Sequence, residues 1–251
     1  MTDWLAAATE QAQAADANDP LLGVRDRFYL PEGRIYLDGN SLGLLSRDAE
    51  AEVLRALDQW KTLGIDGWLS ADPPWFSLGE DLGRAMAPLV GAEPEAVVVT
   101  GSTTVNLHAL VSTFYRPHGE RRKIVATALD FPSDIYALAS QIALRGGDPA
   151  TDLVLVPSRD GRTVDEVDIL AELDETVALA LLPVVLYRSG QLLDVAKLTA
   201  AGHARGVVMG FDAAHSAGSV PHRFDDWASI LPYGAPISTS TPDRGRWERC
   251  T

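Results

Sequence analysis

The sequence predicts an α/β fold with a mostly parallel sheet flanked by helices. Continuous apolar runs, such as residues 177–186 and 207–211, alternate with segments in which apolar residues recur at the helical period. Parallel strands covered on both faces have this continuous apolar character, and amphipathic helices connect them. The length of 251 residues is enough for a large buried core.

The elements follow in order along the chain. Apolar residues at Val53, Leu54, Leu57 and Trp60 predict a helix over residues 47–63 that packs one face. After a loop rich in Trp, Asp and Pro at residues 64–76, a second helix is predicted at about residues 78–90. The remaining strands and helices alternate: strands at 96–99, 124–126, 153–156, 177–186 and 207–211, helices at 105–114, 134–144, 167–173 and 195–205.

Residues 228–251 break this alternation. They contain three prolines and a cluster of arginines, with little apolar periodicity, and resemble neither a next helix nor a next strand. We therefore divide the chain into an N-terminal helical segment at 1–90, a central α/β part at 91–227 and an aberrant tail at 228–251.

Composition excludes several functional classes. The formal net charge of -14 argues against binding to nucleic acid phosphates. With Cys250 as its single cysteine, the chain has neither a disulfide framework nor a cysteine-rich metal site, and we expect no bound metal. The N-terminus lacks a secretory signal pattern, and no segment approaches the roughly 18 apolar residues of a membrane span. We expect a cytoplasmic protein that binds neither nucleic acid nor membrane.

Three loops that follow predicted strands carry candidate site residues. Residues 100–106 (TGSTTVN) open a helix and offer hydroxyls and backbone N–H groups to a phosphate, although such residues are also ordinary turn and cap residues. In residues 130–134 (DFPSD), Phe131 is placed to stack on a planar ring. The alternative is that Ser133 or Asp134 caps the helix and Phe131 fills the core.

The third loop contains Asp212 and His215. An aspartate at the end of a buried strand is costly unless a cation pairs with it, and a protonated pyridine nitrogen is such a cation. A capping aspartate and a structural histidine are the alternative. Ligands of open α/β sheets bind beyond the carboxyl ends of the strands, where all three loops are expected.

Taken together, these segments resemble the kynureninase family, pyridoxal-phosphate enzymes of the aspartate-aminotransferase fold. The resemblance extends in family order over residues 20–227. It is carried by residues 36–43 (YLDGNSLG), 103–108 (TTVNLH), 131–134 (FPSD), 187–191 (YRSGQ), 211–218 (FDAAHSAG) and 226–227 (DW). It implies the large domain of a fold type I enzyme, without the C-terminal small domain.

The resemblance also implies roles for individual residues. Thr103 and Thr104 would hold the cofactor phosphate, Phe131 would stack on the pyridine ring, and Asp212 would keep its nitrogen protonated. Asp134 and His215 would contact the ring substituents. Pro132 and Ser133 complete the cofactor-binding set, and Asn40, Ser41 and Trp68 are assigned to the substrate, with a place in the core as the alternative for Trp68. Pro183 stands where the family often has a small polar residue.

By the same resemblance, the reaction would hydrolyse L-kynurenine or 3-hydroxykynurenine to L-alanine and anthranilate or 3-hydroxyanthranilate. This reaction belongs to tryptophan catabolism and NAD biosynthesis, and the family works as a homodimer.

One residue of the family pattern is absent: no lysine follows Lys197. In the family a segment with the Schiff-base lysine follows Asp-Trp. If one nucleotide were lost near the Trp227 codon, residues 228–245 could be back-translated in the shifted frame to GVDIAVWGSYKYLNAGPG. We therefore expect an out-of-frame tail in which the lysine codon straddles Ile237 and Ser238.

Two readings of the chain follow. It is a kynureninase by descent, or a non-catalytic fragment of a disrupted gene with at most weak cofactor binding; for the chain as written we expect inactivity. A cysteine desulfurase would need a catalytic cysteine, and Cys250 lies in the tail. We also expect an uncovered strand edge and apolar faces, and hence poor solubility.

Overall fold

The computed structural model describes residues 3–39, 41–227, 231–233 and 237–239. Residues 1–75 and residues 76–251 form two compact units, each of which is considered by itself. No helix in the described ranges is long and apolar enough to cross a membrane. The division of the chain by role at residues 90 and 227 stays a prediction.

The first unit is helical. It contains α1 (Asp3–Ala17), α2 (Arg47–Leu63), α3 (Gly67–Ser70) and the 3-10 helices η1 (Leu22–Arg27) and η2 (Gly64–Asp66). Helix α2 has the predicted bounds and is capped by Ser46, whose Oγ accepts a hydrogen bond from the Ala49 N–H at 3.0 Å. The expectation that α2 packs its apolar face is wrong, because Val53, Leu57 and Trp60 remain exposed and α2 buries no residue.

The second unit is built on a seven-stranded sheet. Its order is β1-β7-β6-β5-β4-β2-β3. The strands are β1 (Val97–Val99), β2 (Lys123–Thr127), β3 (Leu153–Val156), β4 (Val177–Pro183), β5 (Val208–Asp212), β6 (Leu231–Tyr233) and β7 (Ile237–Thr239). Strands β2 to β6 are parallel to their neighbours among themselves, whereas β7 is antiparallel to both β6 and β1. The predicted mostly parallel α/β fold is confirmed.

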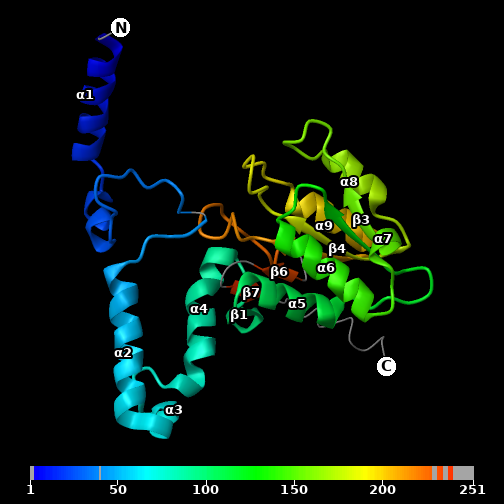
Figure 1. Ribbon diagram of the computed structural model, residues 1–251, viewed down its shortest axis with the longest axis horizontal. Helices are drawn as coiled ribbons and strands as arrows, with labels where there is room; N and C mark the ends of the chain where they lie inside the picture. The colour runs from blue at the N-terminus through cyan, green and yellow to red at the C-terminus, as the bar shows by residue number, and fades with distance from the viewer. Residues whose placement is uncertain (1–2, 40, 228–230, 234–236, 240–251) are drawn as a thin grey trace. The chain divides into compact units, whose positions relative to one another are not determined.

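Helices cover both faces of this sheet (Figure 1). They are α4 (Leu78–Val90), α5 (Thr103–Phe114), α6 (Pro132–Leu144), α7 (Pro149–Asp152), α8 (Glu166–Glu172) and α9 (Val195–Ala204), with short 3-10 helices η3 (Trp75–Ser77) and η4 (Pro94–Ala96). Helices α5 and α6 pack against each other, as do α8 and α9.

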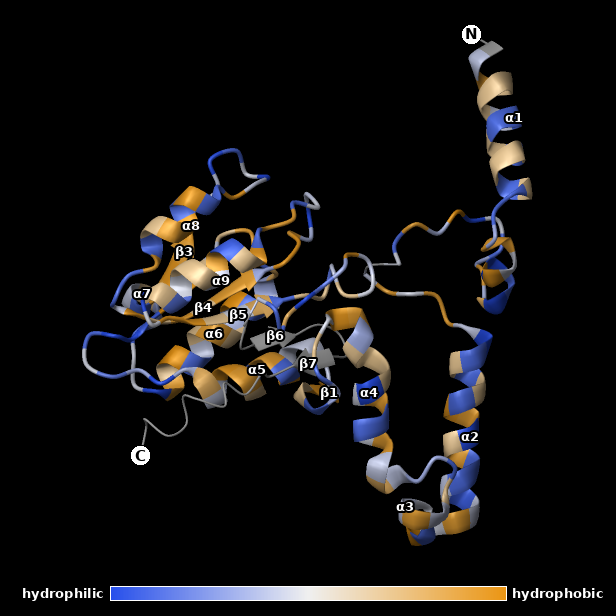
Figure 2. Cartoon of the chain, turned by 180° about the vertical axis from the view of Figure 1, so that it is seen from behind, coloured by the Kyte–Doolittle hydropathy of each residue, from blue (hydrophilic) through white to orange (hydrophobic). Residues whose placement is uncertain are grey.

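The side chains of β2 show why the sheet needs two layers. Ile124 and Ala126 join one core with residues of α5 and α6, while Val125 points into a second core with residues of α8 and α9. Alternate residues of a strand face opposite sides, so a run that is apolar throughout requires cover on both sides. Figure 2 shows the hydrophobic colour concentrated in the central strands.

The tail departs from its prediction. Residues 231–233 and 237–239 form β6 and β7, so the expectation of no further strand is wrong. The expected open edge beside β5 is also wrong, because β6 pairs with β5 from Gly210↔Leu231 to Asp212↔Tyr233. Strand pairing uses main-chain N–H and C=O groups, which every residue except proline supplies, so a segment without apolar periodicity can still complete a sheet.

Candidate functional site

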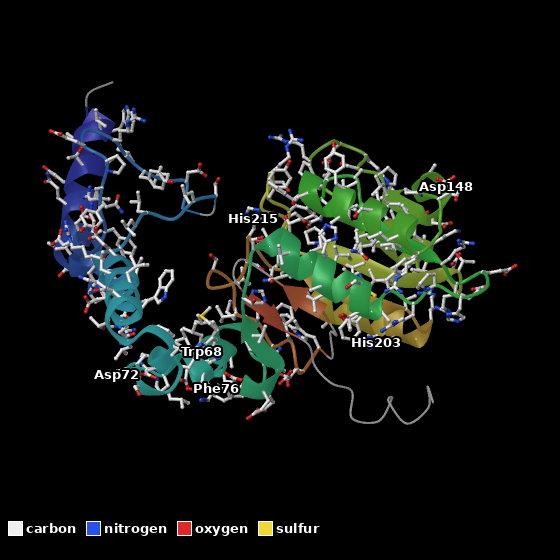
Figure 3. The ribbon with its side chains drawn as sticks, turned by 60° about the horizontal axis from the view of Figure 1, so that its bottom comes forward. Trp68, Asp72, Phe76, Asp148, His203 and His215 are labelled. Carbon is white, nitrogen blue, oxygen red and sulfur yellow. The ribbon has the colours of Figure 1, made fainter. Side chains whose placement is uncertain are left out.

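The loops singled out from the sequence open at the same edge of the sheet. Strands β2, β4 and β5 run in one direction, and the two antiparallel pairings of β7 give β1 that direction too. The loops after β1, β2 and β5 therefore all lie at the carboxyl edge. In Figure 3, His215 marks this edge, while Asp148 and His203 lie toward the opposite end.

Asp212 is the last residue of β5 and lies beside Pro183 of β4 in the register of the sheet. It is only 7% exposed, and its Oδ1 accepts a hydrogen bond from the Ala214 N–H at 2.8 Å. Burial, reinforced by the charge of Asp134, raises the pKa of Asp212 to about 8. None of the ion pairs among the described residues includes Asp212.

Asp134 lies in the first turn of α6 and is buried. It accepts a hydrogen bond from the Ser133 Oγ at 3.2 Å and shares a second hydrogen bond with Asp212. The capping alternative fails here, because the N-cap position of α6 is Phe131, without a side-chain cap, and Pro132 is at the start of the helix. Asp134 is therefore held against Asp212 rather than used to close the helix end.

Three rings stand next to these carboxyl groups. The centroids of Phe131 and Tyr187 are 5.1 Å apart in an edge-to-face arrangement, and those of Tyr187 and His215 are 6.0 Å apart. Phe131 is 44% exposed, so the core alternative for this residue is wrong. The Nδ1 of His215 is buried without a hydrogen-bond partner among the described residues. A ligand with a planar ring and polar substituents would meet both needs.

The start of α5 supplies free backbone donors at the same edge. The helix begins at Thr103, two residues before its predicted start, so both Thr103 and Thr104 lie in the first turn. Its N-cap residue, Ser102, makes no side-chain cap. The turn before it is fixed by the Asn106 Nδ2, which donates to the Thr100 carbonyl at 3.0 Å. Uncapped N–H groups and two hydroxyls suit an anion.

The predicted substrate residues belong to the first unit. Trp68 is half exposed and packs edge-to-face on Trp75 with ring centroids 6.4 Å apart, and Ser41 is exposed in a turn. Asn40 lies outside the described residues. The structure brings the cofactor candidates together within the second unit, and the substrate assignment stays a prediction.

Two residues at the carboxyl edge were missed as site residues. Asp130 is 6% exposed and lies between β2 and α6, and Tyr187 follows β4 and lies between Phe131 and His215. The signal for both was their position after a predicted strand, which had already drawn attention to Phe131 and Asp212.

Neither lysine of the second unit serves this edge. Lys123 opens β2 at the opposite end of the strand, and the Nζ of Lys197 pairs with Glu166 at 2.9 Å. Lys61, the third lysine of the chain, belongs to α2 in the first unit. Ile237 and Ser238, inferred to carry the displaced lysine codon, lie on β7, where Ser238 pairs with Val98.

Comparison with known proteins places these features in a family. Residues 78–230 match the profile of the family described as aminotransferase class-V. Kynureninase of Geobacillus thermodenitrificans (strain NG80-2) is 58% identical over 218 residues, which cover 87% of this chain and 51% of the relative. Kynureninase of Bacillus anthracis is 56% identical over 218 residues with the same shares covered. The chain thus spans about half the length of the curated relatives it matches.

Solved structures share the fold. A C-DES variant, a lysine-to-alanine mutant with glycine covalently linked to its PLP cofactor, matches with a TM-score of 0.74 at 19% identity, covering 87% of this chain and 60% of the other. The apo cysteine desulfurase of Thermococcus onnurineus NA1 matches with a TM-score of 0.69 at 18% identity, covering 88% and 57%.

Proposed function

Because this chain belongs to the class V aminotransferase family, we propose that its carboxyl edge binds pyridoxal 5′-phosphate and that its intact parent is a kynureninase. The observation that carries the proposal is Asp212: a buried carboxyl group at a strand end, without an ion pair among the described residues, beside an exposed aromatic ring. The chain covers half of its relatives, so the activity is proposed for the parent protein.

The residues present fit the cofactor. Asp212 would hold a proton at the ring nitrogen, Phe131 would cover the ring, and the N–H groups and hydroxyls of Thr103 and Thr104 would bind the phosphate. Asp134 and the unpartnered Nδ1 of His215 would bind the ring substituents. Pro132 and Ser133 set the course of the backbone between Phe131 and Asp134 and complete the cofactor-binding set.

Pyridoxal phosphate supplies an electron sink for carbanion chemistry at the amino-acid Cα. The protein's part is to keep that sink effective. A carboxylate held by the Ala214 N–H at 2.8 Å is fixed in place, so it would keep the ring proton at one position. A buried site also excludes water from this pair, which strengthens the attraction between carboxylate and cation.

The substrate we propose for the parent is L-kynurenine or 3-hydroxykynurenine. The products would be L-alanine and anthranilate or 3-hydroxyanthranilate, in tryptophan catabolism and NAD biosynthesis. The 58% identity to a kynureninase supports this choice. In this proposal Trp68, Asn40 and Ser41 contact the aromatic substrate, and the intact protein is a cytoplasmic homodimer.

For the chain as written we propose cofactor binding without turnover. No lysine follows Lys197, and the family match stops at residue 230, three residues beyond Trp227. Both observations support an out-of-frame tail that has lost the Schiff-base lysine. Without that amine, the chain has no group to attach the cofactor or to move the Cα proton.

The experiment is to sequence the gene across the Trp227 codon and express the frame-restored protein beside the present chain. We expect kynurenine hydrolysis and a borohydride-reducible lysine adduct only in the restored protein. Kynurenine turnover by the present chain would refute its inactivity, and an in-frame gene with no homologous text in the alternate frame would refute the frame break.

A cysteine desulfurase is the second candidate, since solved structures of that activity share the fold. It needs a nucleophilic cysteine, and the single one, Cys250, lies outside the described residues. Release of sulfide from cysteine by the frame-restored protein would favour this alternative.

A further inference from the structure

Asp130 is a buried carboxyl group that the proposed cofactor contacts do not use. It follows β2 by three residues, and both of its oxygens are bound to Thr127: Oδ2 accepts from the Thr127 N–H at 3.1 Å, and Oδ1 accepts from its hydroxyl. The Thr127 hydroxyl oxygen in turn accepts from the Leu129 N–H at 3.2 Å. The turn after β2 thus fixes the position of this carboxyl group.

Closing a turn does not by itself require a buried charge. A serine or asparagine can accept the same N–H bond at lower desolvation cost. Burial raises the pKa of Asp130 to about 7, against the opposing effect of its two bonds to Thr127. Above that pH, the turn therefore retains a negative charge that the fold does not neutralise among the described residues.

This charge acts on the cofactor site. The charge of Asp134 raises the pKa of Asp130, and the charge of Asp130 raises the pKa of Asp212. The titratable groups around it come from two elements: Asp134 from α6, and Asp212 from β5. None of the ion pairs in the described part of the chain brings a lysine or arginine to Asp130.

We propose that Asp130 is a positioning residue for the cofactor. Locked onto Thr127, its carboxylate places a second negative charge near Asp212 and makes the site select a ligand whose ring nitrogen carries a proton. Asp130 touches neither the ring nor the phosphate in this scheme; it acts through Asp212. The inference rests on the proposed cofactor site and adds the residue that sharpens its selectivity.

The test compares two ligands. Pyridoxine 5′-phosphate has the basic ring nitrogen but no aldehyde to react with lysines, and its 1-deaza analogue lacks the nitrogen. Dissociation constants are measured by equilibrium dialysis with the full chain. We expect Asp130→Asn to weaken pyridoxine phosphate about five- to tenfold, as one lost charge at moderate range would, and to leave the analogue unchanged.

The pH profile gives a second readout. In the unmodified chain, the preference for pyridoxine phosphate over the analogue should rise between about pH 6 and pH 8 as Asp130 ionises, and Asp130→Asn should flatten that rise. Asp148→Asn is the matched control: it removes the same charge from a helix cap at the other end of the sheet and should change neither affinity. Asp130→Ser is a second neutral variant if the first does not fold.

The outcomes separate the two proposals. If the unmodified chain binds neither ligand, the proposed cofactor site is wrong. If it binds pyridoxine phosphate and the Asp130 variants lose both ligands equally, or lose neither, Asp130 only closes its turn and the inference is overturned.

Discussion

The two ends of the sheet treat buried carboxyl groups in opposite ways. At the amino end, Asp152 at the start of β3 accepts a hydrogen bond from the Arg122 Nε at 3.0 Å, and the Arg121 guanidinium donates to the carbonyls of Val177, Arg205 and Gly206. At the carboxyl end, Asp130 and Asp212 are equally buried, and their pKa values are raised to about 7 and about 8.

The difference separates a structural group from a binding group. A buried carboxylate with its own arginine is complete, so it contributes to folding and has little to offer a ligand. A carboxylate that lacks such a partner costs stability in the free protein and regains it when a cation binds. On this view, the carboxyl end is a site because it is less stable than the amino end.

Replacing Asp212 should have the largest effect. Asp212→Asn is expected to weaken pyridoxine phosphate by about 100-fold or more, as loss of one partner of a buried charged pair costs roughly 3 kcal/mol. The same change should raise the thermal stability of the ligand-free chain at pH 8, because it removes a desolvated acid. Dialysis and thermal denaturation measure the two effects. A variant that loses stability without losing affinity would break the comparison.

Replacing Asp152 should do the reverse. Asp152→Asn is expected to lower the free energy of unfolding by about 1 kcal/mol, since Arg122 is partly exposed and such pairs are modest. Ligand affinity should not change. Urea denaturation measures the loss. A fall in affinity comparable to that of Asp212→Asn would show that the two ends are not independent.

Stability should also depend on pH through the carboxyl end. The folded-state pKa values of Asp130 and Asp212 lie above their unfolded values, so their contribution is fully present below about pH 4 and is lost as pH rises through about 7 and 8. The melting temperature of the ligand-free chain should fall across this upper window. Saturating pyridoxine phosphate should reduce the fall, and Asp212→Asn should reduce it without ligand. An equal slope in all three samples would contradict this assignment.

The smallest effect is expected at Phe131. Its ring is 44% exposed and contacts Tyr187, so Phe131→Leu should change stability little. Loss of stacking should weaken the ligand about three- to tenfold, equivalent to roughly 0.5–1.5 kcal/mol. Tyr136→Leu is the control, because Tyr136 is an exposed aromatic residue of the same helix region. Equal losses in both variants would rule out specific stacking.

The sequence was most informative where burial is symmetrical. Strand β4 is buried throughout, so its apolar run could be recognised directly, and the loops at the strand ends could be located from it. Asp212 and Phe131 were found for this reason. Asp130 was missed because its environment depends on Thr127 and on α6, which become neighbours only in three dimensions.

Other features lay beyond periodicity. The apolar stripe of α2 predicts a buried face, but burial depends on whether another layer covers it, and here it is exposed. Helix α1 shows little amphipathic pattern and was not predicted. Strands β6 and β7 are joined to the sheet by backbone pairing, which leaves no pattern of side chains to read.

The central claim is that the carboxyl end of the sheet keeps a ligand's ring nitrogen protonated through Asp212. Nitrogen NMR of ring-labelled pyridoxine phosphate bound to the full chain tests it directly. The nitrogen should show a protonated chemical shift at a pH where the free ligand has lost this proton, and Asp212→Asn should abolish that signal. A bound ligand with an unprotonated nitrogen, or a protonated one unaffected by Asp212→Asn, would contradict the claim.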